Sequence, residues 1–312
     1  LVIALLAAFA CAGPLTATQY KSHYYDIVSG DVALTEDLAE QMYGDFLVTF
    51  DKTDSGSFDR YEVFRSNLES MIAHNKDKSN TWRRGINKFS DMTEEEFFEH
   101  YNIHAMADQT CSATASPKIT YEGDIPDEVD WRKRPMPHNV PVVTEVKDQG
   151  HCGSCWTFST TGAMESHYAL MTGKYALLSE QQLVDCAQDF DNHGCSGGLP
   201  SHAFEYIRYN GIAFESRYPY HAQDEECHYD EQYNKFATVK ESFNLTKGDE
   251  QQLTETIANN GPVSVAFQVV NGFKDYESGV YTSDVCKNGE TDVNHAVLAV
   301  GYGTEDGLEH YI

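Results

Sequence analysis

The sequence predicts an α+β protein with two lobes, preceded by a separate helical region, and three observations predict it. Residues 18–122 are rich in charged side chains, nearly free of cysteine and helical in pattern. From Ile125 onwards cysteines, glycines and aromatic residues become dense, and helical patterns come first. Beyond Gly261 the pattern changes to period two with β-branched residues, as in residues 262–267. Helices followed by strands are typical of the α+β class.

Length and composition limit the possible functions. The 312 residues suffice for one large domain or two modest ones with real cores. The 49 acidic and 22 basic residues give a formal charge of -27, which repels phosphate backbones and argues against nucleic-acid binding. The histidines are mostly scattered without metal-ligand spacing, so we expect no metal and no other cofactor.

The chain begins with twelve residues that are almost wholly apolar and too short to span a bilayer. Small residues follow, which predicts a signal peptide at residues 1–17. It lacks an initiator methionine and a basic segment, so we expect its N-terminus to be incomplete. Eight cysteines in such a chain favour disulfides and an oxidising compartment. The sequon at Asn244 fits passage through the secretory pathway.

The helical region before residue 125 carries an unusual stripe. Phe64, Asn67, Met71 and Asn75 recur at steps of three and four and therefore share one helix face. Two asparagines on such a face predict a specific buried hydrogen-bond contact. A short helix should follow Thr93, because Thr93 and Glu96 form a capping-box pattern. Residues 111–117 are small and polar, which predicts a linker open to processing.

Helices and strands can also be placed beyond residue 125. Residues 155–171 read as a buried helix that stops at Gly173, and Ser179 opens a second helix that runs to Cys186. Residues 296–303 read as one strand. We expect the run at residues 218–220 to serve packing rather than function.

The motif that carries chemistry is Gln-Gly-His-Cys-Gly-Ser-Cys-Trp at residues 149–156. A thiol attacks a carbonyl only as its thiolate, and Cys155 begins a predicted helix whose dipole would stabilise that anion. His295, about 140 residues downstream, is the candidate base. The side chain of Gln149 and the N–H of Cys155 could bind a developing oxyanion. The alternative makes Cys155 a disulfide cysteine and His295 a core residue, but the Cys-Gly-Ser-Cys-Trp run with a distant histidine is a family signature.

These motifs resemble the papain family of cysteine proteases. Residues 152–163 are similar to its active-site helix, residues 195–200 to its substrate loop and residues 293–303 to its histidine strand. Upstream, the helix stripe resembles the family's pro-domain helix motif at Arg60, Phe64, Asn67, Met71 and Asn75. A second pro-domain motif, Gly-x-Asn-x-Phe-x-Asp, is matched in full at residues 85–91. The first motif's glutamate is Gly56 here, and its isoleucine is Met71.

The resemblance implies a papain-like fold, with a helical lobe and a β-barrel-like lobe. It implies a cysteine peptidase made as a zymogen, with an inhibitory propeptide at residues 18–124 and a peptidase domain at residues 125–312. The propeptide would run through the active-site cleft in reverse and block it. Acidification should protonate some of its many carboxylates, loosen it and lead to cleavage near Ile125. A lysosome-like compartment or secretion, a monomer, peptide and protein substrates, and cystatin-type inhibitors also follow from the resemblance.

The family's site residues carry over by position. The implied disulfides are Cys152–Cys195 and Cys186–Cys227. The implied substrate-binding residues are Gly153, Gly197, Gly198, Leu199, Asn294 and Ala296. Main chain at Gly197 and Gly198 should pair with an extended substrate, and the apolar side chains near Leu199 and Ala296 should form a specificity pocket.

Within the family the likeness is strongest to the cathepsin H group, at residues 157–162, 183–190 and 192–195. Residues 109–114 resemble that group's mini-chain, the pro-segment octapeptide (here residues 107–114) that stays disulfide-linked to the mature enzyme. Its C-terminal carboxylate, here that of Thr114, would hold the substrate's ammonium and make the enzyme an aminopeptidase. The glycosylated asparagine of the group's mini-chain is Thr110 here.

Three alternatives stay open. Cys111 could be an incidental thiol in a linker, and the enzyme would then be a cathepsin L-like endopeptidase. The chain could also be a non-catalytic papain-scaffold binding or inhibitor protein, but that class usually loses the cysteine or the histidine. On counting alone Cys111 could pair with Cys286. In the cathepsin H group both corresponding cysteines pair near the C-terminus.

The chain stops at Ile312, before the family's Asn-Ser-Trp-Gly segment. We therefore expect the catalytic asparagine and the two partner cysteines to lie beyond it. A polypeptide that ends at Ile312 should fold poorly and be inactive.

Overall fold

The computed structural model describes residues 17–53, 58–104, 112, 125–134, 139–287, 289 and 292–312. Cys111, Thr114 and almost all of the expected signal peptide lie outside the described residues. The chain divides into two compact units, described separately below. The first comprises Leu1–Phe97 and Asn271–Thr282, and the second comprises Phe98–Val270 and Ser283–Ile312. Among the described residues, none of the helices has the length and apolarity needed to cross a membrane.

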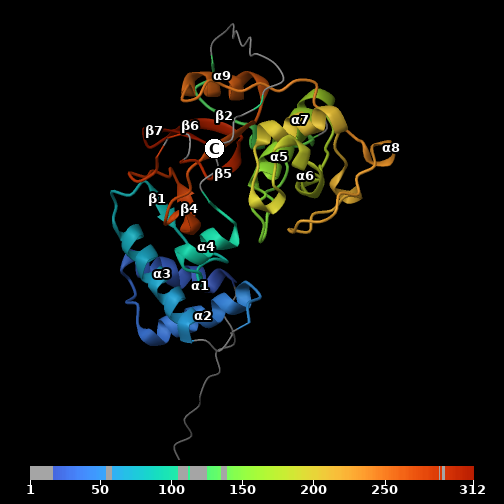
Figure 1. The fold of residues 1–312 in the computed structure, drawn as a ribbon. Helices are drawn as coiled ribbons and strands as arrows, with labels where there is room; N and C mark the ends of the chain where they lie inside the picture. Colours follow the sequence, from blue (N-terminus) through green and yellow to red (C-terminus); the bar gives the residue numbers. More distant parts are fainter. Residues whose placement is uncertain are drawn as a thin grey trace, which may run out of the picture. The chain divides into compact units, whose positions relative to one another are not determined.

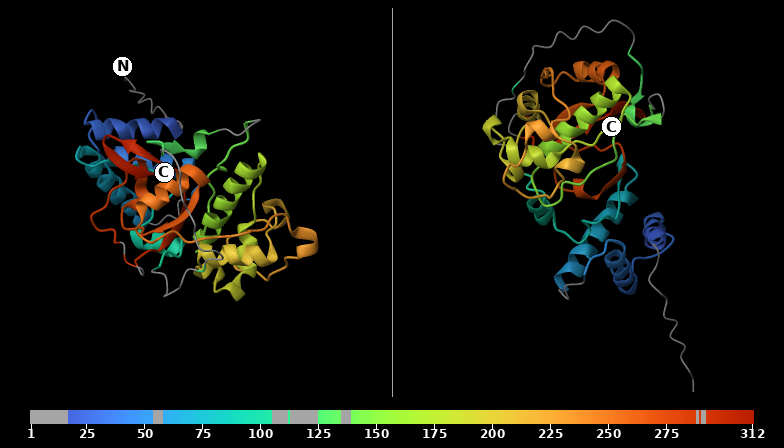
Figure 2. Two further views of the ribbon diagram at one scale, coloured as in Figure 1. Left: turned by 90° about the horizontal axis from the view of Figure 1, so that it is seen from above. Right: turned by 90° about the vertical axis from the view of Figure 1, so that its right-hand side faces the viewer.

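The first unit is built on three helices, α1 (Ala17–Ser29), α2 (Glu36–Thr49) and α3 (Phe58–Lys76). They lie together in both views of Figure 2, where they are coloured in shades of blue. Their shared core is apolar and includes Tyr24, Met42, Phe46, Phe64, Leu68 and Met71. Because each helix buries only one face, this core holds the three helices together.

The asparagine stripe makes the buried contacts that its pattern predicts. Asn67 Nδ2 donates to the carbonyls of Ser90 at 3.0 Å and Met92 at 2.8 Å. Asn75 Nδ2 donates to Tyr24 Oη and to the Arg84 carbonyl, both at 2.7 Å, and its Oδ1 accepts the Arg84 N–H at 2.9 Å. The predicted capping box is also confirmed. Thr93 Oγ1 accepts the Glu96 N–H at 3.1 Å, and Glu96 Oε2 accepts the Thr93 N–H at 2.9 Å, at the start of α4 (Glu94–His100).

Two strands that lie far apart in the sequence, one near residue 83 and one near residue 278, complete the first unit. β1 (Trp82–Arg84) pairs antiparallel with β4 (Tyr276–Gly279), with Trp82 opposite Gly279. Asn87 Nδ2 donates to the Lys274 carbonyl at 2.7 Å. The 271–282 segment, far downstream in sequence, therefore belongs to the same compact unit as helices α1, α2 and α3.

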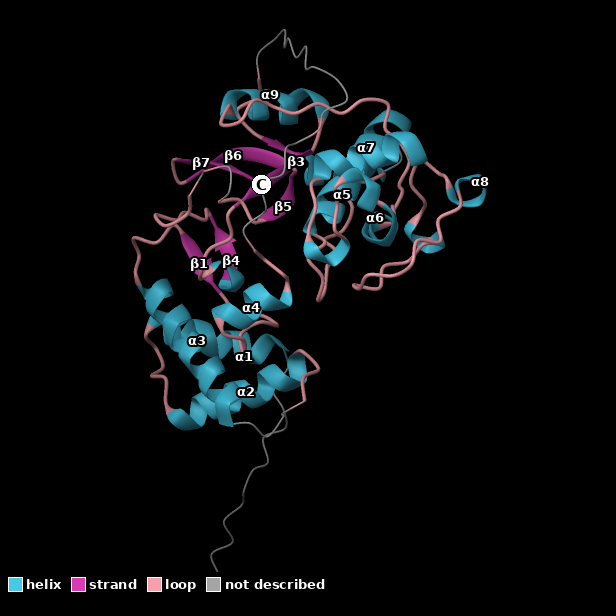
Figure 3. Ribbon diagram, in the orientation of Figure 1, coloured by secondary structure: helices cyan, strands magenta, loops and turns pink. Residues whose placement is uncertain are grey.

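The second unit holds helices in one part and strands in another, as Figures 1 and 3 show. The predicted helices are confirmed as α5 (Cys155–Thr172) and α6 (Glu180–Cys186). α5 ends at Gly173, which takes the left-handed conformation with φ of 66°. α6 begins with Ser179 Oγ accepting the Gln182 N–H at 3.0 Å. They share an apolar core with α7 (Pro200–Asn210).

The remaining helices of the second unit are short or lie among the strands. They are α8 (Glu231–Asn234) and α9 (Glu250–Asn260). Short 3-10 turns occur in both units at Trp131–Lys133, Gln188–Phe190, Gly194–Ser196, Glu215–Arg217 and Phe273–Asp275.

The strands of the second unit form two sheets. β3 (Val263–Phe267) pairs antiparallel with β5 (His295–Ala299), so that Phe267 faces His295 in the register. The second sheet has the order β2 (Val129–Asp130), β6 (Gly301–Glu305), β7 (Leu308–Tyr311). α9 and both sheets supply residues to one apolar core, among them Val129, Ile257, Ala299 and Tyr302.

The prediction of one strand at residues 296–303 is wrong, because the strand breaks at Val300. On one side β5 pairs with β3, and on the other β6 pairs with β2 and β7. At the break the Val300 carbonyl accepts the Trp131 N–H at 3.0 Å and its N–H donates to the Ile312 carbonyl at 2.6 Å. The chain changes sheets here, a tertiary event that no local pattern signals.

Replacing Asn75 with alanine should destabilise the first unit by about 2–3 kcal/mol, because three hydrogen bonds in a buried site are lost. Hydrogen–deuterium exchange of the precursor should accelerate at residues 58–86 by roughly 30- to 100-fold. Asn80→Ala is the matched control, since it removes a bond to the His74 carbonyl at a half-buried site. Equal exchange in the two variants would contradict the role given to the stripe.

Candidate active site

Cys155 is the first residue of α5, and its sulfur lies where the helix leaves N–H groups unpaired. Backbone N–H groups of Ala296, Trp156 and Cys155 itself face the sulfur and act to lower the pKa of the thiol. Ala296 follows His295 in β5, so the fold brings the sulfur to the His295–Ala296 peptide across about 140 residues of sequence. The two residues singled out from the sequence are therefore neighbours in space.

A serine one turn into α5 fixes this arrangement. Ser159 Oγ donates to the Val297 carbonyl of β5 at 2.7 Å and lies 2.6 Å from Ser264 Oγ of β3. Because both strands are held to one point of the helix, the start of α5 cannot slide along β5. The His295 ring packs edge-on against Phe267, and its buried Nδ1 makes no hydrogen bond with the described residues.

Burial keeps both groups uncharged in this state. It raises the pKa of the Cys155 thiol, although the three backbone N–H groups act in the opposite direction. Burial also lowers the pKa of His295 to about 4. A thiolate and an imidazolium would stabilise each other, but burial disfavours each charge on its own. Burial therefore favours the thiol and the neutral imidazole in this structure.

Gln149 directly precedes the loop at residues 150–153, which leads to the proposed nucleophile Cys155 and is called the nucleophile's loop below. Its Nε2 donates to the Cys152 carbonyl at 2.8 Å, and its own carbonyl accepts the hydroxyl of Tyr220 at 2.6 Å. The loop is fixed by the disulfide Cys152–Cys195 and by the Gly153 N–H, which donates to the Cys195 carbonyl at 2.9 Å. The second disulfide joins Cys186 to Cys227. Both disulfides join the pairs that the resemblance implies.

The Gly197–Gly198 segment disfavours side chains. A Cβ at Gly198 would clash with Asn192 Oδ1 and lie 2.8 Å from the Trp156 ring, whereas Gly197 has open space around it but a φ of 111°, which residues with side chains rarely adopt. Asn192 Oδ1 also accepts the Leu199 N–H at 3.0 Å, which holds Leu199 at the start of α7. This segment therefore presents main chain, as pairing with an extended peptide requires.

Asn294 uses its side chain inside the fold. Its Oδ1 accepts the Val269 N–H at 2.7 Å, and its Nδ2 donates to the Val269 carbonyl at 3.0 Å. A substrate contact at this position would have to come from the main chain. Ala296 is buried and directs its N–H at the Cys155 sulfur.

A residue of the pro-region lies against this loop, and sequence reasoning did not identify it. Asn102 Nδ2 donates to the Cys195 carbonyl at 2.7 Å. A Cβ at Gly153 would meet the same side chain at 2.9 Å. Nearby, Nδ1 of His100 lies 3.4 Å from Nδ1 of His151. Asn102 belongs to the second unit, so its position against the nucleophile's loop is part of that unit.

A carboxylate network lies behind Gln149, and sequence reasoning missed it as well. Lys147 Nζ lies 2.6 Å from Glu165 Oε1 and from Glu180 Oε1. Glu215 and Tyr220 join Lys147 and Glu180 in lining a cavity of about 290 Å³. Burial raises the pKa of Glu215 to about 7. Its Oε1 accepts the Tyr220 N–H at 2.8 Å, and its Oε2 is buried without a hydrogen bond to the described residues.

No group of three or more histidine, cysteine, aspartate or glutamate side chains within the described part of the chain could hold a metal ion. The arrangement of a thiol at a helix N-terminus, a neighbouring imidazole and nearby amide donors is suited to nucleophilic attack on a carbonyl.

Two family models match the chain. The first, described as papain family cysteine protease, matches residues 125–312. The second, described as cathepsin propeptide inhibitor domain (I29), matches residues 43–97.

Known proteins resemble the chain over most of its length. Pro-cathepsin H of Bos taurus is 49% identical over 256 residues, which cover 82% of this chain and 74% of that protein. A thiol protease named aleurain-like from Arabidopsis thaliana is 48% identical over 256 residues, which cover 81% of this chain and 68% of that protein.

Solved structures of precursors have the same fold. Digestive procathepsin L 3 from the larval midgut of Tenebrio molitor matches with a TM-score of 0.75 and 33% identity, over 88% of this chain and 87% of that one. The proform of the ragweed pollen allergen Amb a 11, a cysteine protease, matches with a TM-score of 0.73 and 34% identity, over 89% and 84% of the two chains.

Glu215→Gln should remove a pH-dependent loss of stability. The folded-state pKa of Glu215 is raised to about 7, so folding favours the protonated carboxyl group. The stability that this group contributes is fully present below its ordinary pKa of 4.5 and is lost as pH rises through 7. Glutamine stays neutral and can still accept the Tyr220 N–H. The variant's Tm should exceed that of the wild type by about 2–5 °C at pH 8 and equal it near pH 4.5.

The matched control is Glu226→Gln, which changes an exposed carboxylate in the same part of the chain. Its Tm should follow that of the wild type at every pH. Parallel Tm curves for Glu215→Gln and the wild type between pH 4.5 and 8 would contradict the assigned burial effect.

Proposed function

The chain belongs to the papain family of cysteine proteases, and from this premise we propose that Cys155 is the nucleophile and His295 the general base of its peptidase. It is a zymogen, with a propeptide inhibitor domain ahead of the protease. One observation carries the proposal. The Cys155 sulfur lies at the N-terminus of α5 and faces the N–H of Ala296, the residue that follows His295.

The proposed reaction is hydrolysis through an acyl-enzyme. His295 takes the thiol proton, and the Cys155 thiolate attacks the peptide carbonyl. The Gln149 amide and the Cys155 N–H stabilise the oxyanion. His295 then protonates the leaving amine, and water releases the acyl group by the same route in reverse. A third polar group at His295 Nδ1 would orient the ring, which fits the buried and unpaired state of that atom.

The propeptide supplies the inhibition. Asn102 donates to the carbonyl of Cys195, the disulfide partner of Cys152, and lies against Gly153, two residues before Cys155. We expect a peptide substrate to meet Gly153, Gly197 and Gly198 through its main chain, and Leu199 and Ala296 through an apolar side chain. The Asn102 segment has to leave before a substrate can use this surface.

We infer that the enzyme acts mainly as an aminopeptidase. Two observations support this proposal. Pro-cathepsin H of Bos taurus is 49% identical. Ser112, in the proposed mini-chain at residues 107–114, donates its N–H to Ser201 Oγ of α7 at 3.3 Å, two residues beyond Leu199. The proposed mini-chain would keep Cys111 in a disulfide and end with the carboxylate of Thr114.

The remaining proposals concern the protein's setting. The two disulfides support synthesis through the secretory pathway, with delivery to a lysosome-like compartment or secretion. Asn244 is half-buried and Thr246 exposed in the loop before α9, a placement compatible with a glycan at Asn244. We propose a monomer that cystatin-type inhibitors can recognise.

Replacing the proposed nucleophile should abolish hydrolysis. In the activated full-length gene product, Cys155→Ser and His295→Ala should each lower kcat/KM for a peptide substrate by roughly 10⁴-fold or more, because serine is a poor nucleophile here and alanine cannot take a proton. A thiol-trapping epoxide should label Cys155 in the wild type and nothing in Cys155→Ser. His193→Ala, a change at an exposed histidine, is the control and should keep wild-type activity. Unchanged hydrolysis by Cys155→Ser would refute the proposal.

Removing Cys111 should convert the aminopeptidase into an endopeptidase, because the carboxylate that pairs with the substrate's ammonium is no longer retained. Cys111→Ser should cleave an N-blocked peptide at least roughly tenfold faster than the wild type and lose selectivity for free N-termini. Ser112→Ala keeps the thiol and the main-chain N–H and should behave like the wild type. Non-reducing mass analysis that finds no residues of the 107–114 segment on the wild-type enzyme would instead indicate a cathepsin L-like endopeptidase.

A further inference from the structure

A tyrosine hydroxyl joins the two residues that flank the nucleophile's loop. Tyr220 Oη donates to the Gln149 carbonyl at 2.6 Å and lies 2.6 Å from Ser154 Oγ. A phenol has one proton, and that proton is used on Gln149. Ser154 must therefore donate its hydroxyl proton to Tyr220. The resulting chain Ser154–Tyr220–Gln149 has one direction only.

This use of Ser154 is unusual for its position. Ser154 is the N-cap of α5, where a serine oxygen commonly accepts an N–H of the first helical turn. Here its side chain makes no such cap bond, because the hydroxyl is turned to Tyr220. The N–H groups of Cys155 and Trp156 act to lower the pKa of the Cys155 thiol. The tyrosine thus keeps the N-cap oxygen away from the donors at the nucleophile.

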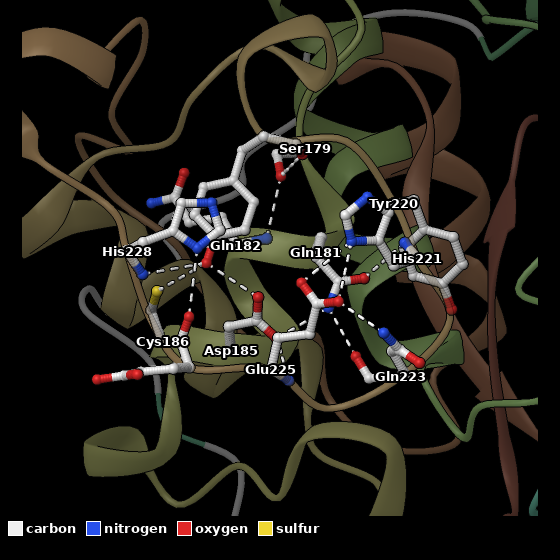
Figure 4. Close-up of polar contacts among 12 residues, drawn as sticks. Ser179, Gln181, Gln182, Asp185, Cys186, Tyr220, His221, Gln223, Glu225 and His228 are labelled. Atoms are coloured by element: carbon white, nitrogen blue, oxygen red, sulfur yellow. Dashed lines mark hydrogen bonds and ion pairs between the residues drawn. The ribbon is translucent and has the colours of Figure 1, made fainter.

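Tyr220 is held firmly enough to act as a fixed point. Its N–H donates to Glu215 Oε1 at 2.8 Å, and the next residue donates its N–H to Gln181 Oε1 of α6, also at 2.8 Å. Figure 4 shows Gln181 reaching toward His221 beside Tyr220. The Tyr220 ring packs edge-on against Phe158 of α5 with ring centres 5.0 Å apart.

Gln181 of α6, which holds His221, makes further hydrogen bonds to α6 and to the loop that follows Tyr220. Gln181 Nε2 donates to Asp185 Oδ1 at 2.8 Å and to the Gln223 carbonyl at 2.7 Å. Asp185 also accepts the Glu225 N–H at 3.0 Å and the Tyr218 hydroxyl at 2.9 Å. These contacts, drawn in Figure 4, fix the loop that carries Tyr220. Burial raises the pKa of Tyr220 to about 12, so the donor is present throughout the working range of an acidic or neutral compartment.

We propose that Tyr220 is a positioning residue for the oxyanion site, which fixes Gln149 relative to the first turn of α5. The inference rests on the proposed function, because it takes Gln149 and the Cys155 N–H as the oxyanion donors. Tyr220 touches neither substrate nor sulfur. It acts by holding the main-chain carbonyl of Gln149 and the side chain of Ser154 at one distance. This fixes the backbone from which the Gln149 amide, bonded here to the Cys152 carbonyl, can turn to the developing oxyanion.

The test is Tyr220→Phe, which keeps the ring and removes the hydroxyl. In the activated full-length gene product kcat should fall by about 10- to 50-fold with KM changed less than about threefold, since the loss is confined to the transition state. A peptide aldehyde forms a tetrahedral adduct whose oxygen occupies the oxyanion site, so its affinity should fall by a similar factor. Alkylation of Cys155 by iodoacetamide creates no oxyanion, and its rate should change less than about threefold.

Tyr302→Phe is the matched control, because it also removes the hydroxyl of a buried tyrosine that donates to a main-chain carbonyl, that of Pro126, away from the Tyr220 loop. It should lower the Tm and leave kcat, aldehyde affinity and alkylation unchanged. Ser154→Ala serves as a second probe that does not disturb the loop, with an expected loss of aldehyde affinity of about three- to tenfold.

Equal losses in aldehyde affinity and alkylation, or no loss in either Tyr220→Phe or Ser154→Ala, would overturn the inference. Hydrolysis that survives in Cys155→Ser would overturn the proposed function instead, so the two failures are distinguishable.

Discussion

The packing of α5 against β5 is the constraint on which the site depends. It places the helix N-terminus, and with it the Cys155 sulfur, at the N–H of Ala296. Ser159 fixes the axial position through the Val297 carbonyl, and Gly162 allows the close approach, because a Cβ there would lie 3.1 Å from Leu298. A Cβ at Gly162 would require the end of the Leu298 side chain to shift by a few tenths of an ångström. The packing of α5 against β5 therefore determines whether the Cys155 thiol and the His295 imidazole lie close enough to exchange a proton.

The same packing buries Cys155 and His295 and so favours their neutral forms over the ion pair. A buried thiol and a buried imidazole are each held neutral by desolvation, which opposes the transfer of a proton between them. Ion-pair formation needs compensating interactions, such as a partner for His295 Nδ1, which is buried and unpaired within the described residues. Asn102 meanwhile donates to the Cys195 carbonyl and lies against Gly153. In the proposed mechanism, inhibition combines this contact with a Cys155–His295 pair whose neutral forms are favoured by burial.

Sequence reasoning succeeded where a local pattern has one tertiary meaning. The Asn67 and Asn75 stripe could be predicted because asparagine on an apolar helix face needs a partner, and the helix from Cys155 could be predicted as a buried helix with its stop at Gly173. It failed where the partner comes from elsewhere in the chain. The break at Val300 depends on a change of sheet, and the position of Asn102 depends on the Cys195 carbonyl. Residues 218–220 were expected to serve packing, yet the hydroxyl of the last one bonds both flanks of the nucleophile's loop.

The acidic composition of the propeptide predicts activation by acid. Whether acid stabilises or destabilises the first unit depends on the direction in which folding shifts the pKa of each carboxyl group. The pKa of Glu96 is lowered by its hydrogen bonds to Arg60, so its stabilising contribution to the first unit is lost as pH falls through that lowered value. Glu94 and Asp275 have pKa values raised by burial, so folding favours their protonated forms, and acid strengthens rather than weakens their contribution. Loosening at low pH must therefore come from groups like Glu96, against an opposing contribution from the buried carboxyls. Net acidity alone does not decide the direction, because the burial of each carboxyl group does.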